Sequence, residues 1–303
     1  MSESYFDFHV HSYLSDGDHS PDEVCRAAHA HETGLAHIAL TDHDAILPEH
    51  ERKKLAQKHD IDLISGCEIS CLWTHPGTKQ KVVIHLGGHW LVPHAPLLHE
   101  VLKHNQAQPY DSYVKEMLWR CEKLGLDPTG GKGVDNAYEQ IKAAHPHSKH
   151  LGKRAVAQFL VSSGCVETRQ AAYELFACGG PAHVVATDHL QFVPFEEAMC
   201  AINRHGLSTL NHLFYYHLDD AGYVALLQDF KRLGGQALET IYPRYGHIQR
   251  MQLHRICNKY DLIPNAGSDR HDDSRAFMQG SDGLFQQLRQ RQLEMHGTLR
   301  NEL

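Results

Sequence analysis

The sequence contains no long apolar run and no closely spaced cysteine pair. No apolar stretch approaches the roughly 20 residues that a membrane-spanning helix needs, and the opening Met-Ser-Glu-Ser does not begin the basic and then apolar pattern of a signal peptide. The eight cysteines form no Cys-x-x-Cys pair, which is typical of free thiols in a reducing compartment. These absences predict a cytoplasmic protein with no membrane partner.

The chain has too few basic residues to bind duplex nucleic acid through a broad basic surface. The chain has 29 lysines and arginines against 37 acidic residues, which gives a formal net charge of −8 with histidine neutral. Duplex nucleic acid is bound through broad basic surfaces, so no duplex partner is expected. Local cations or metal ions can still hold a small phosphorylated substrate or a nucleic-acid end.

Histidine is the residue that the sequence has in excess, with 27 among 303 residues. The first strand-like segment, residues 5–11, alternates apolar side chains with Asp7, His9 and His11. Alternate residues of a strand share a face, so the two imidazoles lie side by side at the strand end and can bind one metal ion. Asp16 follows on the next turn.

The same arrangement recurs along the chain, where short apolar runs end in a histidine or an acidic residue. Such runs end at His43, Glu68, His85, His212, Glu239 and Asp269. Helical patterns lie between them, the first with a capping box from Ser20 to Glu23. Alternating β and α segments predict a parallel barrel or sheet with its site at the carboxyl ends of the strands. For Glu239, a place at the rim of that site is favoured over a structural role.

Residues 92–186 interrupt the alternation with several helical segments, and the loop 125–133 among them has one proline and four glycines. We interpret 92–186 as an inserted helical subdomain, a lid that selects substrate. Residues 1–91 and 187–303 then form the barrel. The alternative, that these helices are ordinary outer helices of the barrel, stays open.

Four motifs resemble, in order and spacing, those of the PHP (polymerase and histidinol phosphatase) family. They are His-x-His at 9–11, Thr-Asp-His at 41–43, a histidine at 85 after an apolar run, and Ser-Asp-x-His at 268–271. Leu-Val-x-Ser-Gly at 160–164 and Gly-Gly-Pro-Ala at 179–182 are similar to the branch of nucleoside 3′,5′-bisphosphate phosphatases and 5′-to-3′ exonucleases. The resemblance implies an α/β fold, a distorted seven-stranded (β/α) barrel similar to a TIM barrel.

The resemblance also implies two or three divalent ions, manganese, iron or zinc, and a set of ligands. The first ion would be held by His9, His11, Glu68 and Asp269. Glu68 would bridge to a second ion, also held by His85 and His212. A third ion would be held by Asp16, His43 and His271. Mixed imidazole and carboxylate ligands suit these metals, and a hydroxide shared by two ions would attack phosphorus. The implied catalytic residues are Glu68, Asp269 and His271.

The candidates for binding the phosphate are cations close in sequence to the site segments. They are Lys153, Arg154, Arg244, Arg270 and Arg275. For each of them, a solvated surface charge stays open as the alternative.

The chain departs from the family pattern on the substrate side. Asn211-His212-Leu213 stands where relatives have Ala-His-Pro followed by an arginine, Ala155 replaces a histidine, and Tyr245 replaces another. Several tyrosines near these positions would either stack a base or pack the rim. They are Tyr215, Tyr216, Tyr242 and Tyr245.

The sequence therefore predicts a metal-dependent phosphoesterase, a phosphatase or phosphodiesterase. Its expected substrate is a small nucleotide, similar to a nucleoside 3′,5′-bisphosphate, or an oligonucleotide 5′ end. Two alternatives stay open. One is a phosphatase of histidinol phosphate or another small metabolite, and the other is a non-catalytic metal-binding protein of the same family.

Overall fold

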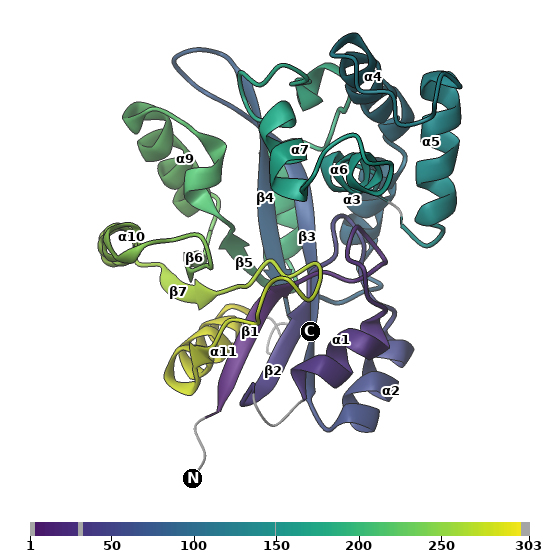
Figure 1. Cartoon of the computed structure of the whole chain (residues 1–303). Coiled ribbons are helices and arrows are strands. Elements are labelled where there is room, and N and C mark those ends of the chain that lie inside the picture. Colours follow the sequence, from purple (N-terminus) through teal and green to yellow (C-terminus); the bar gives the residue numbers. More distant parts are fainter. Residues whose placement is uncertain (1–3, 30–32, 149, 298–303) are drawn as a thin grey trace. The chain divides into compact units, whose positions relative to one another are not determined.

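The computed structural model describes residues 4–29, 33–148 and 150–297 of the chain (Figure 1). The described residues form two compact units. Unit 1 comprises Met1–Asn105 and Phe192–Leu303, and unit 2 comprises Gln106–Gln191. The role of residues 92–186 as a substrate-selecting insertion stays a prediction. Within the described residues, no helix is both long and apolar enough to cross a membrane.

Unit 1 is built on one sheet of eight strands, in the order β7-β6-β5-β4-β3-β2-β1-β8. The strands are β1 (Tyr5–Val10), β2 (Leu35–Leu40), β3 (Asp62–Thr74), β4 (Lys81–His89), β5 (Leu207–Leu210), β6 (Ala237–Ile241), β7 (Ile263–Ala266) and β8 (Gly280–Ser281). The predicted α/β barrel class is confirmed. The sheet has an eighth, two-residue strand beyond the seven expected, and it is mixed rather than all parallel.

The segment after β7 brings the two ends of the sheet together. The amide of Asp269 donates to the carbonyl of His9 at 2.7 Å, and the amide of His11 donates to the carbonyl of Arg270 at 2.9 Å. Val10 and Arg270 thereby form a parallel bridge. The barrel is nearly closed at this seam, and the seam holds the His9–His11 pair beside Asp269.

A long hairpin breaks the expected parallel pattern. Strands β3 and β4 pair antiparallel, with Glu68 opposite Gly87, and β4 also pairs antiparallel with β5. The expectation that Glu68 and His85 end their strands was therefore wrong, because both lie in mid-strand. Cys67 and Ile69, on either side of Glu68, point to one face of β3 and pack into the apolar core. Glu68 points to the opposite face.

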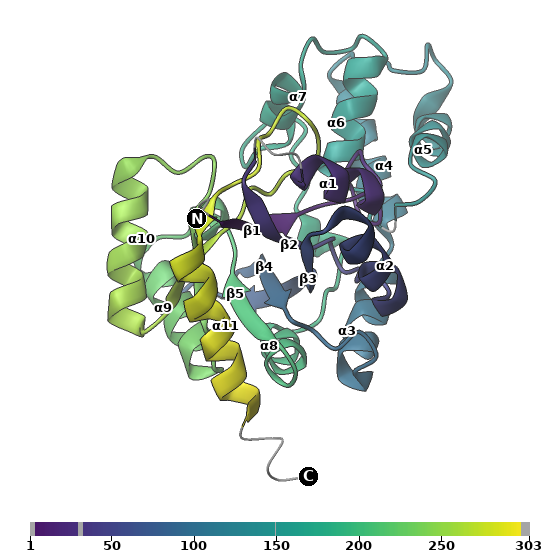
Figure 2. The ribbon, with the colours of Figure 1, turned by 90° about the horizontal axis from the view of Figure 1, so that it is seen from below.

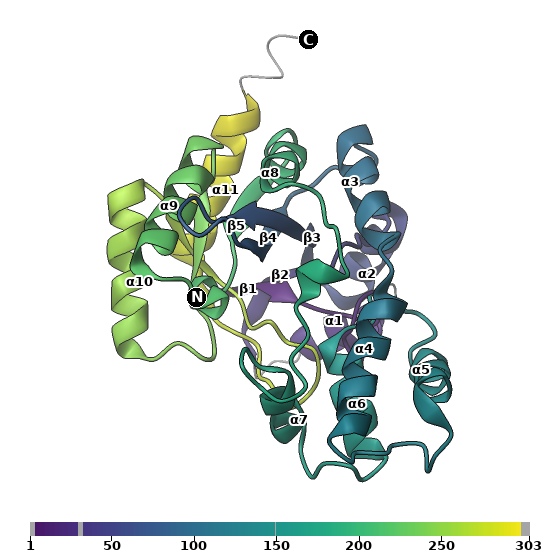
Figure 3. The ribbon, with the colours of Figure 1, turned by 90° about the horizontal axis from the view of Figure 1, so that it is seen from above.

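Helices surround the strands of unit 1. They are α1 (Pro21–Ala28), α2 (Glu49–His59), α3 (Pro96–Gln106), α8 (Phe195–Asn203), α9 (Asp220–Arg232), α10 (His247–Tyr260) and α11 (Asp282–Gly297). Views from below and above show α2, α8, α9 and α11 around the outside of β1–β5 (Figures 2 and 3). The predicted capping box of α1 is confirmed, since Ser20 and Glu23 bond reciprocally. Phe195, Phe230 and Leu86 lie in the largest buried apolar cluster.

Unit 2 consists of short helices. They are α4 (Tyr110–Lys123), α5 (Gly133–Ala144), α6 (Lys153–Ser162), α7 (Arg169–Phe176) and the 3-10 turn η1 (Ala186–Asp188). Helix α4 packs against α5 and α6, and α6 packs against α7. Met117, Leu160 and Phe176 are almost fully buried, so unit 2 has apolar packing of its own. Four glycines of the predicted loop 125–133 have positive φ, as a turn-rich connection requires.

Candidate metal centre

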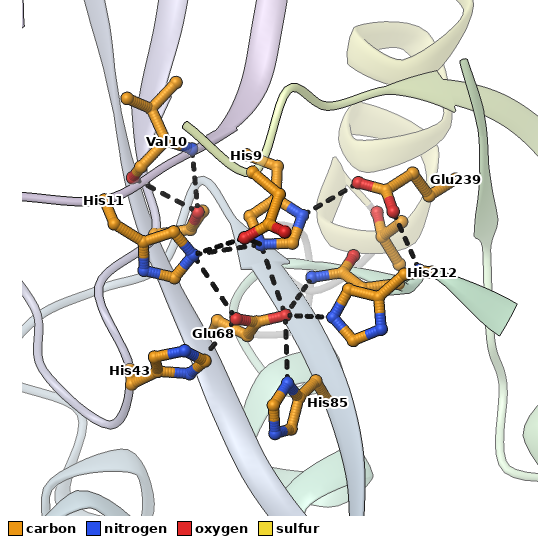
Figure 4. Close-up of polar contacts among 12 residues, drawn as sticks. His9, Val10, His11, His43, Glu68, His85, His212 and Glu239 are labelled. Atoms are coloured by element: carbon orange, nitrogen blue, oxygen red, sulfur yellow. Dashed lines mark hydrogen bonds and ion pairs between the residues drawn. The ribbon is translucent and has the colours of Figure 1, made fainter. Parts of the chain in front are cut away.

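Histidine and acidic side chains from several strands of unit 1 converge on one buried cluster. His9 lies in β1 and His11 just after it, and both are 1% exposed. His43 follows β2, and His212 follows β5. Parallel strands place their carboxyl ends at the same side of a barrel. That geometry brings residues far apart in the sequence together, as Figure 4 shows.

Glu68 is the centre of the cluster, and its side chain is fully buried. Five imidazole nitrogens surround its carboxylate at 3.1 to 3.6 Å. They are Nε2 of His9, His11 and His212 and Nδ1 of His43 and His85. Burial raises the pKa of Glu68, but the charges of the surrounding histidines, His9 first, outweigh it and hold the pKa well below its usual range. Glu68 is therefore an anion that faces several nitrogen donors.

Asp269 adds a second carboxylate with a divided role. Its Oδ1 lies 3.4 Å from His11 Nε2 and 3.4 Å from His271 Nδ1. Its Oδ2 accepts hydrogen bonds from the Tyr242 hydroxyl at 2.9 Å and from Arg275 Nη1 at 2.7 Å. Burial raises the pKa of Asp269, but the neighbouring His271 and the other cationic groups hold it well below its usual range. One oxygen of this anion remains turned toward the histidines.

Asp16 forms a third focus. Its Oδ1 lies 3.1 Å from His271 Nε2, 3.9 Å from His11 Nδ1 and 4.0 Å from His43 Nε2. Burial raises the pKa of Asp16, and the charges of His271 and His43 overcome that effect and lower the pKa well below its ordinary value. A carboxylate that stays ionised among imidazoles is the donor set that a transition metal ion prefers.

Four overlapping groups of these residues have all their ligand atoms within 4.8 Å of one another. The groups are His11–Asp16–His43–His271, His9–Glu68–His212, His9–His11–Asp269 and His43–Glu68–His85. All nine predicted ligand residues occur in these groups. The grouping differs from the expected one, because His85 and His212 meet Glu68 in separate groups and His11 joins the Asp16 group.

The residues fit a polynuclear metal site on the chemistry of the donors. Glu68 Oε2 is buried among imidazole nitrogens, with His43 Nδ1 at 3.1 Å and His11 Nε2 at 3.5 Å, but it accepts no hydrogen bond from the described residues. Burying a carboxylate oxygen in this way is costly, and bound cations would relieve that cost. Imidazole mixed with carboxylate suits manganese, iron or zinc better than magnesium or calcium.

Glu239 holds two of the histidines from behind. Its Oε1 lies 2.8 Å from His9 Nδ1, and its Oε2 accepts the backbone amide of His212 at 2.7 Å. A carboxylate on the far nitrogen fixes the ring orientation and the tautomer of a ligand histidine. In His9 this contact leaves Nε2 to face Glu68. The sequence pattern favours a place at the rim of the site for Glu239, whereas its side chain is buried and only 1% exposed.

Asn211 was not recognised from the sequence as a functional residue. Its Nδ2 donates to Glu68 Oε1 at 2.8 Å. A Cβ atom at Gly87, opposite Glu68 in the hairpin, would lie 2.9 Å from Asn211 Oδ1. The glycine therefore makes room for the amide that holds Glu68. Two sequence signals were present: the departure from the family's Ala-His-Pro at Asn211, and a glycine pair, Gly87 and Gly88, inside an apolar strand.

Asp7 and Asp42 tie backbone segments together under the cluster. Asp7 accepts the amides of His9, Ser268 and Met278 at 3.2, 3.0 and 2.8 Å. Burial raises the pKa of Asp7 to about 6 against the lowering effect of these bonds. Asp42 accepts the amide of Ser12 at 2.7 Å. Both carboxylates hold the loops that carry ligand residues, rather than the imidazole rings themselves.

The predicted phosphate-binding cations lie in different places. Arg270 is 6% exposed, pairs with Asp273, and its guanidinium lies 4.8 Å from the Phe277 ring centre. Arg244 is exposed. Lys153 and Arg154 begin helix α6 of unit 2 and are half-buried. Arg275, also considered for this role, instead bonds Asp269 in the cluster, as described above.

Two curated relatives are similar to this chain over most of its length. A 5′-3′ exoribonuclease of Haemophilus influenzae is 29% identical over 266 residues, which cover 88% of this chain and 89% of that protein. A 3′,5′-nucleoside bisphosphate phosphatase of Chromobacterium violaceum is 25% identical over 268 residues, which cover 88% of this chain and 86% of that protein.

A solved structure and a family model show where the fold belongs. The structure of an amidohydrolase from Chromobacterium violaceum, with bound sulfate and no metal, superposes with a TM-score of 0.79. The two chains are 22% identical, with 95% of this chain and 96% of the other covered. Residues 7–266 match the family model described as PHP domain. Because this match spans most of the sequence, the chain belongs to the PHP domain family.

Proposed function

We propose that this PHP-family phosphoesterase hydrolyses a phosphate ester of a small nucleotide, similar to a nucleoside 3′,5′-bisphosphate, or of an oligonucleotide 5′ end. The observation that carries the proposal is the cluster of three ionised carboxylates and six imidazoles in overlapping groups. Such a cluster suits two or three divalent ions and the hydrolysis of a charged ester. The printed names of the two relatives support nucleotides and RNA as the substrate class.

Each ion would be held by residues that already lie together. Glu68 would be shared between ions, with His9 and His212 on one side and His43 and His85 on the other. Two further sets would complete the site, namely His9–His11–Asp269 and His11–Asp16–His43–His271. When bound, manganese, iron or zinc would generate a nucleophile from water at neutral pH and neutralise charge on the phosphate oxygens.

The chain's own residues prepare the site before any ion or substrate binds. Glu239 orients His9, and Asn211 restrains one oxygen of Glu68. Tyr242 and Arg275 hold Oδ2 of Asp269, which leaves Oδ1 for the reacting side. These contacts fix the donor atoms in place, so little reorganisation is needed when the ester arrives.

The catalytic roles of Glu68, Asp269 and His271 are part of this proposal. Nδ1 of His271 lies 2.9 Å from the backbone carbonyl of Asp269, an arrangement that leaves Nε2 facing Asp16. Arg244 stays a candidate for a phosphate contact because it is exposed. Arg270 would first have to leave Asp273. The roles of Lys153 and Arg154 stay predictions from the sequence.

Metal content, together with the release of phosphate or of a nucleotide, tests the proposal. The protein is stripped of metal, reloaded with manganese, iron or zinc, and offered adenosine 3′,5′-bisphosphate, a 5′-phosphorylated oligoribonucleotide, histidinol phosphate and p-nitrophenyl phosphate. We expect two or three ions per chain and the highest kcat/KM on one of the two nucleotide substrates. A fully loaded protein that releases neither phosphate nor a nucleotide from any of these esters would refute the phosphoesterase activity. A clear preference for histidinol phosphate would refute the nucleotide assignment alone.

A further inference from the structure

An exposed tyrosine lies beside the metal centre, on the turn that follows His212. The turn is the short 3-10 helix η2 (Leu213–Tyr216). Tyr215 is 54% exposed, and its ring centre lies 5.8 Å from that of His212. A large aromatic surface is therefore open to solvent directly next to a proposed metal ligand.

The aromatic residues on either side of Tyr215 serve the fold. The Phe214 ring lies 5.6 Å from that of Tyr245 and is half-buried. The Tyr216 hydroxyl accepts the amide of His85 at 3.0 Å and contacts the carbonyl of Asn211 at 3.0 Å. These two side chains fix the turn to the barrel, so Tyr215 remains exposed on a rigid support.

The backbone at both ends of the turn is in the left-handed region. His212 has φ of 27° and His217 has φ of 50°, although neither residue is a glycine. Such conformations persist where the surrounding contacts determine them, and they gather at functional sites. Here the Glu239 carboxylate holds the amide of His212. The geometry of the turn is thus coupled to the metal centre.

Arg244 is the partner of Tyr215. Its guanidinium carbon lies 5.7 Å from the Tyr215 ring centre, and Nη1 lies 3.5 Å from the Tyr215 hydroxyl oxygen. Arg244 belongs to the loop after β6 that also supplies Tyr242, the hydrogen-bond donor to Asp269. Both loops that carry this pair therefore also contact the metal cluster. Nucleobases stack on aromatic rings and on guanidinium planes alike.

We propose that Tyr215 and Arg244, the tyrosine–arginine platform, bind the nucleobase of the substrate and thereby select nucleotides over other phosphate esters. The inference rests on the proposed function, because it requires the phosphate to bind at the neighbouring metal centre. Of the four tyrosines that the sequence marked for stacking or packing, Tyr242 and Tyr245 are buried at 2% and 6% exposure. Tyr216 is half-buried. Tyr215 is the member of this set that presents its ring to a ligand.

Two ligands that differ only in the base test the platform. Adenosine 3′,5′-bisphosphate and ribose 3,5-bisphosphate are compared for the wild type, Tyr215→Ala, Tyr215→Phe and Arg244→Ala. Ile248→Ala removes another exposed apolar side chain of unit 1, 73% exposed, and is the matched control. The readouts are kcat/KM of the manganese-loaded enzyme and, by calorimetry on the same loaded protein, the dissociation constants of the phosphonate analogues of both ligands, which are not hydrolysed.

Base stacking on an aromatic ring is usually worth a roughly fivefold to hundredfold gain in affinity. We therefore expect Tyr215→Ala to reduce the preference for the base-containing ligand by that factor in both readouts. Tyr215→Phe should keep most of the preference, Arg244→Ala should lose part of it, and Ile248→Ala should keep all of it. An unchanged ratio in Tyr215→Ala, or an equal loss on both ligands, would overturn the platform.

The platform and the proposed function fail in different ways. If the loaded wild type releases phosphate from neither ligand, the proposed function is refuted, and the calorimetric ratio still decides the platform. If the wild type hydrolyses both ligands and Tyr215→Ala leaves their ratio unchanged, the platform alone is refuted.

Discussion

The buried metal cluster and the exposed rim next to it, formed by Tyr215 and Arg244, differ in how many contacts hold their side chains. In the cluster, Glu68 and Asp269 each contact several side chains, and the histidines are oriented from behind by residues such as Glu239. On the rim, Tyr215 lies against Arg244 and is mostly exposed. The two regions are joined by the turn that follows His212 and by the loop after β6, which carries Arg244 and also Tyr242, the hydrogen-bond donor to Asp269.

The difference separates two kinds of constraint. A buried group of charges must be satisfied as a whole, because removing one partner leaves others desolvated and unpaired. An exposed side chain can change with little cost to stability. The cluster is therefore expected to determine the chemistry, and the rim is where this chain can choose its substrate. It is also where the sequence departs from the family pattern.

Loss of a histidine from the cluster should have the largest effect. His9→Ala removes a nitrogen that two of the four ligand groups share. We expect the metal content, measured by mass spectrometry, to fall by at least one ion per chain. Turnover should fall by more than the roughly 10- to 100-fold typical of residues behind the ligands. The matched control is His50→Ala, whose side chain is 82% exposed. Near-normal activity in His9→Ala would remove His9 from the site.

A smaller effect is expected from the residue behind the cluster. Glu239→Gln keeps the shape of the side chain but removes the charge that orients His9 and accepts the amide of His212. Metal affinity or activity should drop roughly 10- to 100-fold. Asp220→Asn, an exposed acidic residue at the start of α9, serves as control. Equal behaviour of the two variants would show that Glu239 only fills space.

The close approach of Asn211 to Gly87 can be measured as a coupling free energy between substitutions at the two positions. Gly87→Ala would place a Cβ 2.9 Å from Asn211 Oδ1 and 3.2 Å from His89 Nε2, so it should destabilise the fold by about 1–3 kcal/mol. In an Asn211→Ala background part of that penalty should vanish, which gives a coupling of about 0.5–2 kcal/mol in urea unfolding. Strict additivity of the two substitutions would argue that the glycine serves another purpose.

The smallest effect on stability is expected at the rim. Tyr215→Ala should leave the free energy of unfolding within about 1 kcal/mol of the wild-type value, because it removes an exposed ring and one cation–π contact. The metal content should also be unchanged. A loss as large as that of Gly87→Ala in the same urea titration would mean that the rim and the cluster are one cooperative structure.

Local rules predicted that several of these residues would lie together, whereas the full ligand set was implied by the family resemblance. His9 and His11 share a face because a strand has a two-residue period. The carboxyl ends of the parallel strands bring His43, His212 and Asp269 to the same side of the barrel. Glu68 and His85 lie in the cluster, but the sequence pattern placed them at strand ends, because a parallel barrel was assumed. Only the antiparallel register of β3 and β4 reveals that both lie in mid-strand.

The supporting contacts could not be predicted, because they join residues that no local pattern connects. Glu239 meets His9 across 230 positions, and Asn211 meets Glu68 across 143. Their side chains are also common in purely structural roles. Arg275, considered for a phosphate contact, turned out to hold Asp269, since its direction depends on how the loop after β7 returns to the barrel.

The sequence alone therefore determined which residue types meet at the metal centre, because strand periodicity and βα alternation are short-range properties of the chain. The tertiary structure decided which carboxylate oxygen of the cluster faces which histidine nitrogen. It also decided that Gly87 leaves room for the Asn211 side chain, and that Tyr215 is the exposed one of four tyrosines. These outcomes depend on packing between distant segments, where a shift of about one ångström separates a hydrogen bond from a gap.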